Sequence, residues 1–184
     1  NKYGRSTIYG GSYDAYIEQA RLGANTQACF GIYGSGNNGN QSWVVSHDAK
    51  GRAENCYLNY GLYNADGGYA ESYGGIYAAK GGVQTYGITN GGANTVHKGE
   101  RGSAWGEGGS TGNYGYYNTA VANANVDGYS LRGGTYSVYH QNAGAFYVGQ
   151  TKFDGGYKWP GEGVFKCHSV YDASSYDSVS CVQN

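Results

Sequence analysis

The sequence predicts an all-β domain, an antiparallel β-sandwich or jelly roll built from short hairpins. Apolar and polar residues alternate with a period of two over most of the chain, as in strands that bury one face. Clusters of Gly, Asn and Asp bound the alternating runs, and these residues tolerate the positive φ of two-residue hairpin turns. No composition shift marks a linker, so we expect residues 1–184 to form a single domain.

One segment departs from the strand pattern. Residues 12–22 begin with a Ser that can cap a helix, carry acidic residues early and stop before Gly23. These signals allow one short N-terminal helix without requiring it. Three Asp-Gly segments, at Asp66, Asp127 and Asp154, resemble one another but are unevenly spaced, which argues against a solenoid or propeller. The remaining elements are strands, which we expect at residues 27–33, 42–47, 53–63, 75–79, 82–89, 134–140, 143–152, 163–171 and 176–182.

Tyrosine supplies much of the apolar surface of this chain. The 184 residues include 22 Tyr and 3 Trp, and each Tyr ring combines a large apolar area with a polar tip. A net charge of −1 and a single Pro argue against a disordered chain. The 12 Lys and Arg are scattered singly among 13 Asp and Glu, so we expect no nucleic-acid partner. The apolar runs are too short to cross a bilayer, so we expect no membrane span.

Two disulfides are the natural interpretation of four cysteines without a C-x-x-C spacing. A hairpin turning at residues 172–175 would place Cys167 opposite Cys181, which favours that bond and leaves Cys29 to pair with Cys56. The second bond fits less well, because a three-strand meander would set its two cysteines two strands apart, beyond disulfide reach. Disulfides imply an oxidising compartment.

A secreted, extracellular protein fits these features. Asn40 opens an Asn-Gln-Ser glycosylation acceptor in a Gly-rich turn. The segment 34–39 matches G-x-G-x-x-G but leads from strand to strand, so no nucleotide cofactor is expected. The segment 123–128 resembles the start of a calcium loop but lacks the Glu at its twelfth position, where Gly134 stands, so we expect a turn there and no metal.

The segment 97–112 is the candidate ligand site. It is Gly-rich, has no strand pattern and gathers charged groups in a chain poor in charge, which predicts a long functional loop. We expect Trp105 to stack on a sugar ring, with His97, Arg101 and Glu107 hydrogen-bonding its hydroxyls. The alternative is a Gly-rich loop whose Trp folds onto the domain.

These observations favour a secreted, non-enzymatic protein that binds a glycan or another extracellular polymer through exposed Tyr and Trp. A self-associating fibre or matrix protein is the alternative, because low charge and many strand edges promote association. A glycan hydrolase or a secreted toxin ranks third. The hydrolase would use Glu100 and Glu107, which would have to lie about 5 to 10 Å apart.

Overall fold

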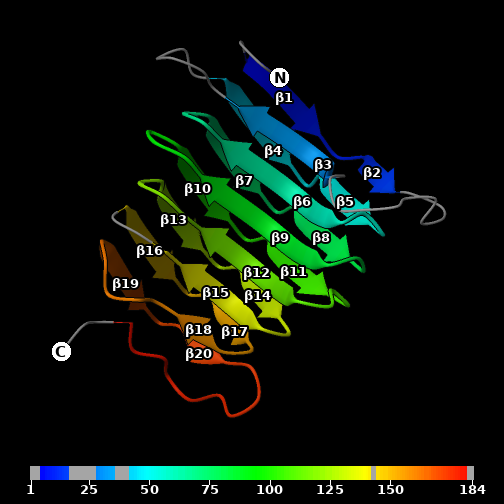
Figure 1. Ribbon diagram of the computed structural model, residues 1–184. Helices are drawn as coiled ribbons and strands as arrows, with labels where there is room; N and C mark the ends of the chain where they lie inside the picture. The colour runs from blue at the N-terminus through cyan, green and yellow to red at the C-terminus, as the bar shows by residue number, and fades with distance from the viewer. Residues whose placement is uncertain (1–4, 17–27, 36–41, 142–143, 182–184) are drawn as a thin grey trace.

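The computed structural model describes residues 5–16, 28–35, 42–141 and 144–181, and within these ranges it contains strands and no helix. The chain winds as a β-solenoid of about five turns, and every paired strand runs parallel to its neighbour. Figure 1 shows the turns following one another from the N-terminal to the C-terminal end of the molecule. In this described part of the chain, no helix is long and apolar enough to cross a membrane.

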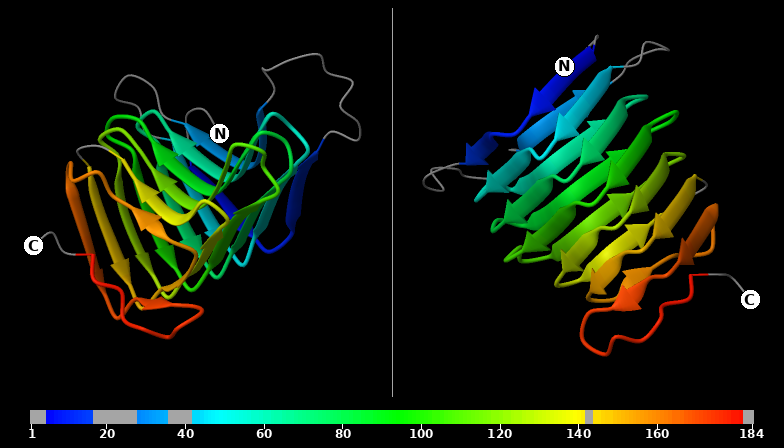
Figure 2. Two further views of the ribbon diagram at one scale, coloured as in Figure 1. Left: turned by 60° about the horizontal axis from the view of Figure 1, so that its bottom comes forward. Right: turned by 180° about the vertical axis from the view of Figure 1, so that it is seen from behind.

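Three sheets run the length of the solenoid, and the strands of each lie side by side from turn to turn (Figure 2). Sheet A contains β1 (Arg5–Tyr9), β4 (Trp43–His47), β7 (Tyr69–Tyr73), β10 (Val96–Glu100), β13 (Asn123–Asp127), β16 (Ala145–Gly149) and β19 (Val164–His168). Sheet B contains β2 (Ser12–Tyr16), β5 (Lys50–Glu54), β8 (Ile76–Lys80), β11 (Ser103–Glu107), β14 (Ser130–Gly133), β17 (Lys152–Asp154) and β20 (Tyr171–Asp172). Sheet C contains β3 (Ala28–Ser35), β6 (Leu58–Ala65), β9 (Gln84–Gly91), β12 (Gly112–Asn118), β15 (Tyr136–His140) and β18 (Tyr157–Lys158).

The antiparallel sandwich or jelly roll expected from the sequence is therefore wrong. Strand alternation and turn residues were identified, but most of the turns are corners between sheets and not hairpin reversals. At the corner between sheets A and B, the backbone takes a left-handed φ at Gly10, Asp48, Gly74, Arg101 and Gly128 in successive turns. Each such residue bends the chain into the next sheet, where the following strand pairs with the equivalent strand of an adjacent turn.

Other element predictions had mixed outcomes. The first part of the expected helix, Ser12–Tyr16, is strand β2, and residues 17–22 lie outside the described residues. The expected strand at 53–63 is the end of β5, a corner and most of β6. The expected loop at 97–112 is mainly the two strands β10 and β11. Of the expected strand at 176–182, residue 182 lies outside the described residues, and residues 176–181 form one antiparallel bridge, between Tyr171 and Ser178.

Glycines let sheets B and C approach backbone to backbone. A Cβ on Gly61 in β6 would lie 2.5 Å from the Ala78 amide nitrogen in β8 and 2.6 Å from the Gly87 carbonyl oxygen in β9. Gly87 and Gly115 face sheet B in the same way in the next two turns. Because only a residue without Cβ fits there, these glycines define a seam between the two sheets.

An asparagine ladder holds the corner between sheets C and A. The Asn64 amide donates to Asn90 Oδ1 at 2.9 Å, and the Asn90 amide donates to Asn118 Oδ1 at 2.8 Å. The Asn118 amide nitrogen lies 3.1 Å from His140 Nδ1 in the following turn. All four side chains are buried, and the amides also donate to corner carbonyls, including that of Val96. The ladder thus satisfies backbone groups that the corner leaves without a strand partner.

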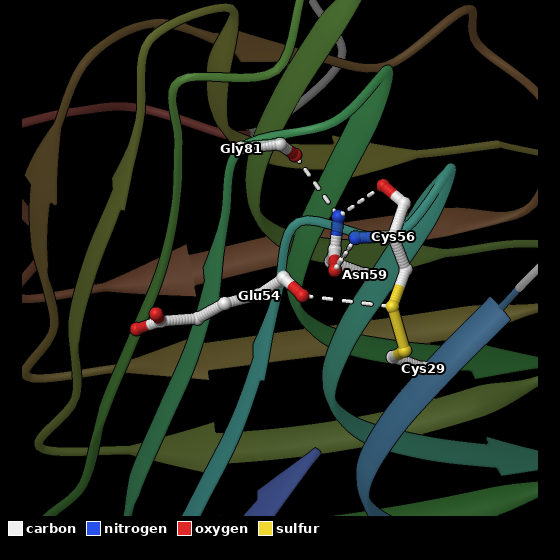
Figure 3. Close-up of a disulfide and its surroundings, with 5 residues drawn as sticks. All are labelled: Cys29, Glu54, Cys56, Asn59 and Gly81. Carbon is white, nitrogen blue, oxygen red and sulfur yellow. Dashed lines mark hydrogen bonds between the residues drawn. A yellow bond between two sulfur atoms is a disulfide. The ribbon is translucent and has the colours of Figure 1, made fainter. Parts of the chain in front are cut away.

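Both expected disulfides are present. Cys29 lies in β3 and Cys56 at the corner before β6, with Cα atoms 5.9 Å apart, because β3 and β6 are direct neighbours in sheet C (Figure 3). Asn59 braces this corner: its Oδ1 accepts from the Cys56 amide at 3.0 Å, and its Nδ2 donates to the carbonyls of Cys56 and Gly81 (Figure 3). The bond therefore joins two consecutive turns.

The second disulfide closes the C-terminal end. Cys167 in β19 bonds to Cys181, with Cα atoms 5.2 Å apart. The chain turns back after β20, and Cys181 packs into the apolar core with Val170 and Val179. The turn expected at residues 172–175 is confirmed, since the Asp172 carboxylate accepts hydrogen bonds from the two serines that follow Ala173. This segment covers the last turn of the solenoid.

Candidate functional site

The outer side of sheet C carries nine aromatic rings in two columns, which together we call the aromatic face. The first column contains Phe30, Tyr60, Tyr86, Tyr114 and Tyr136, one residue per turn. The second column contains Tyr33, Tyr63, Thr89, Tyr117, Tyr139 and Lys158.

The sequence of each strand explains why both tyrosines point outward. The strands β6, β9 and β12 share the pattern Tyr-Gly-x-(Tyr/Thr)-Asn, and their pairing register skips the glycine. Asn59, Leu62 and Asn64 are buried, whereas Tyr60 and Tyr63 are half-exposed. The glycine thus places two outward tyrosines three residues apart, while the glycine itself contacts sheet B.

The first column is a regular stack. Ring centroids lie 5.1 Å apart from Phe30 to Tyr60, 5.0 Å from Tyr60 to Tyr86 and 5.1 Å from Tyr86 to Tyr114, with interplanar angles of 10° or less. The last step, from Tyr114 to Tyr136, is 6.4 Å. Offset rings at this spacing cover part of each other's faces, so the outer surface consists of ring edges, hydroxyls and partly exposed faces. The middle ring, Tyr86, is the most covered and is only 8% exposed.

The second column is less regular. The rings of Tyr33 and Tyr63 are stacked at 5.7 Å, and those of Tyr117 and Tyr139 meet edge to face at 5.2 Å. Thr89 interrupts the column and is 4% exposed. Lys158 ends it, with its Nζ 5.3 Å from the Tyr139 ring centroid, within cation–π range.

Several hydroxyls of the aromatic face have a raised pKa. Burial and neighbouring tyrosines raise the pKa of Tyr60 to about 12, and burial also raises the pKa values of Tyr86, Tyr114 and Tyr117. Two of these hydroxyls donate to glutamine side chains beside the columns. The Tyr86 hydroxyl donates to Gln84 Oε1 at 2.8 Å, and the Tyr117 hydroxyl donates to Gln141 Oε1 at 2.7 Å. These tyrosines are thus uncharged hydrogen-bonding groups at neutral pH.

Charge separates sheet C from sheet B. The described strands of sheet C contain no Asp or Glu, and Lys158 is their single charged residue. On sheet B, Glu107 lies 3.9 Å from Lys80 and 3.8 Å from Arg132, and Arg132 also lies 3.7 Å from Asp154. Sheet B therefore has the charged face usual for solvent contact, whereas the outer side of sheet C is aromatic and carries one charge, that of Lys158.

The residues expected to bind a glycan lie apart. His97 is fully buried in the core, with Nε2 2.9 Å from Ser72 Oγ and Nδ1 2.6 Å from the Tyr116 hydroxyl oxygen. Trp105 and Glu107 lie on the outer face of sheet B. The glycines of this segment are required for packing, since a Cβ on Gly99, for example, would meet the Tyr129 ring at 2.8 Å.

Arg101 lies at the corner between sheets A and B. It lines a shallow pocket of about 390 Å³ with His47, Asp48, Tyr73 and Gly74. The rings of His47 and Tyr73 are stacked at 5.0 Å and form one wall. The pocket is separate from the aromatic face.

The two carboxylates considered for hydrolysis are on different sheets. Glu100 ends β10 in sheet A and Glu107 ends β11 in sheet B, with a corner between them. Asn40, the glycosylation acceptor, lies outside the described residues. In the described ranges, no three His, Cys, Asp or Glu side chains converge as metal ligands would.

Sequence reasoning missed the aromatic face, although its signal was present. The pattern YGLYN, YGITN and YGYYN begins at Tyr60, Tyr86 and Tyr114 and identifies successive turns, whereas the Asp-Gly segments are unevenly spaced. Comparison with protein-family models, curated proteins and solved structures gives no match to this chain.

Proposed function

We propose that this chain is a non-enzymatic binding protein that holds an extended extracellular polymer on its aromatic face. The observation that carries the proposal is the pair of aromatic columns on one nearly uncharged sheet. Tyr rings lose little side-chain entropy on binding and combine apolar contact with hydrogen bonding. Four of the five strands beneath them, β6, β9, β12 and β15, are fixed by parallel pairing on both sides, so the platform is preorganised.

Binding accounts for the aromatic face better than hydrolysis does. Glycoside hydrolysis needs two carboxyl groups on either side of the scissile bond. The described strands of sheet C contain no carboxylate, and Glu100 and Glu107 lie on other sheets. Two disulfides are compatible with an extracellular location, where structural polymers occur.

Self-association through the same face is the second candidate. The turns of a second copy repeat at the same spacing, so the aromatic faces of two copies could meet in register along their whole length. Such a contact would bury tyrosines that are half-exposed in the single chain. The two candidates differ in whether the isolated protein is monomeric.

Co-sedimentation with insoluble polysaccharides tests the proposal. The double variant Tyr63→Thr/Tyr117→Thr removes two rings from the second column, where Thr89 shows that threonine is accommodated. Tyr147→Thr is the matched control, because Tyr147 is 44% exposed on sheet A. We expect wild type and control to bind at least one polymer, and the double variant to bind at least about tenfold more weakly.

The melting temperature of each variant shows whether its fold is retained, and light scattering gives the oligomeric state. Equal binding by the double variant and wild type would refute the role of the aromatic face. A concentration-dependent dimer that the double variant loses, without polymer binding by wild type, would establish the second candidate instead.

A further inference from the structure

From the geometry of the aromatic face we infer its ligand class: an uncharged, hydroxyl-rich linear glycan that lies along the solenoid axis with one sugar ring per turn, over five turns. This inference depends on the proposed function, since it specifies the polymer and its orientation. It rests on the repeat of the first column, the chemistry of its outer surface and the position of its two ends.

The repeat determines the orientation. Successive ring centroids from Phe30 to Tyr114 are 5.0 to 5.1 Å apart from one turn to the next, close to the spacing of hydrogen-bonded strands, and the last step, to Tyr136, is 6.4 Å. A ligand that makes the same contact in each turn must repeat at this distance, and extended β-1,4-linked glycans place one sugar ring at nearly that interval. Along a strand there are only two rings, as at Tyr60 and Tyr63, so no comparable repeat exists in that direction.

The chemistry of the surface favours a neutral glycan over a protein partner or a charged polymer. A tyrosine hydroxyl is protonated at neutral pH and can both donate and accept hydrogen bonds, and burial raises the pKa of Tyr60 and Tyr114 further. The hydroxyls from Tyr60 to Tyr136 match a ligand with hydroxyls on every unit, and Phe30 adds a ring contact without a hydroxyl in the first turn. The charge of Lys158 lies over the Tyr136 and Tyr139 rings at one end, which leaves no charged row to bind a polyanion.

The ends determine the length of the site. Phe30 belongs to β3, the terminal strand of sheet C, and Tyr136 is the last ring of the first column. The next strand, β18, has Tyr157 opposite Val138 and Lys158 opposite Tyr139, so it adds no ring to either column. Five turns therefore carry first-column rings, and a sixth sugar would find no equivalent contact.

The test is a length series of neutral β-1,4-linked oligosaccharides, from two to about eight sugars, of glucose, N-acetylglucosamine, xylose and mannose, measured by calorimetry. For the series that binds, we expect affinity to rise about two- to tenfold per added sugar up to five sugars and then to level off. Tyr136→Thr should end the rise one sugar earlier. Trp105→Ala, on sheet B, should leave the whole series unchanged.

Each alternative outcome separates the inference from the proposed function. Polymer binding with an affinity that is constant from two sugars upward, or that requires an anionic glycan, would overturn the inference and leave the proposed function standing. Retention of the full five-sugar rise in Tyr136→Thr would also overturn it. Failure of every polysaccharide and oligosaccharide to bind would overturn both, and a dimer formed through sheet C would then indicate a second copy as the partner.

Discussion

His97 should make this protein sensitive to acid. The ring is fully buried, and both its nitrogens bond to neutral hydroxyls, those of Ser72 and Tyr116, so no nearby carboxylate compensates a positive charge. The Ser72 hydroxyl is shared with Tyr129, which is also buried and neutral. Burial lowers the pKa of His97 from its ordinary 6.5 to about 3.

The sign and size of the effect follow from this shift. In the unfolded chain the imidazole takes up a proton as the pH falls below 6.5, whereas in the folded chain it stays neutral until the pH approaches 3. Stability is therefore full above pH 6.5 and is lost as the pH falls through this window. Each pH unit costs about 1.4 kcal/mol, so at pH 4.5 His97 alone should lower the free energy of unfolding by about 3 kcal/mol.

Urea denaturation of the oxidised protein at pH 7.5 and pH 4.5, followed by Trp fluorescence, measures this loss. His97→Gln is the control, because its amide can keep one hydrogen bond but does not titrate. His140, whose pKa burial also lowers, and the carboxylates titrate in both proteins, so the difference between them isolates His97. We expect the variant to be less stable by about 1 to 3 kcal/mol at pH 7.5 and to lose about 3 kcal/mol less on acidification. Equal losses in the two proteins would refute the reasoning.

Two further substitutions test the packing around sheet C. Gly61→Ala should destabilise the fold by about 3 kcal/mol or more, because the new Cβ would overlap backbone atoms of two neighbouring strands. The control Gly156→Ala should change the melting temperature little, because its Cβ would have its nearest neighbour at 3.8 Å. Similar melting temperatures for the two variants would exclude a close seam between sheets B and C. Thr89→Val should raise the free energy of unfolding, measured by urea denaturation, by about 1 kcal/mol, since the buried Thr89 hydroxyl has no hydrogen-bond partner. Thr95→Val should lower it by about 1 to 3 kcal/mol, because the Thr95 hydroxyl bonds two backbone groups. A loss of stability in Thr89→Val would show that the Thr89 hydroxyl is hydrogen-bonded.

Local chemistry could be predicted from sequence, and long-range pairing could not. The alternation at Phe146, Tyr147 and Val148 reads as strand in either topology, because a strand with one buried face has the same pattern in a sandwich and in a solenoid. The disulfides were predicted from cysteine count and the hairpin at 172–175. The apparent difficulty of bonding Cys29 to Cys56 arose from the assumed meander and disappears when the strands one turn apart are neighbours.

The candidate site shows the same division. Trp105 and Glu107 were grouped with His97 because they are close in sequence, but a chain that passes from one sheet to the next every few residues sends neighbours to different faces. Conversely, Tyr60, Tyr86 and Tyr114 are far apart in sequence and stack in space. Sequence distance is therefore a poor guide to contact in a solenoid, where each residue lies beside its equivalents in the turns before and after.

By itself, the sequence determined the all-β character, the two disulfides and the importance of tyrosine, because these depend on residue type and local spacing. Only the tertiary structure decided that the strands are parallel, that His97 is inside and that the tyrosines form two columns on one sheet. The physical reason is that Gly and Asn supply left-handed backbone equally well to a hairpin reversal and to a corner between sheets. The choice between them is made by the glycine seam between sheets B and C and the asparagine ladder of the solenoid, which exist only once several turns are stacked.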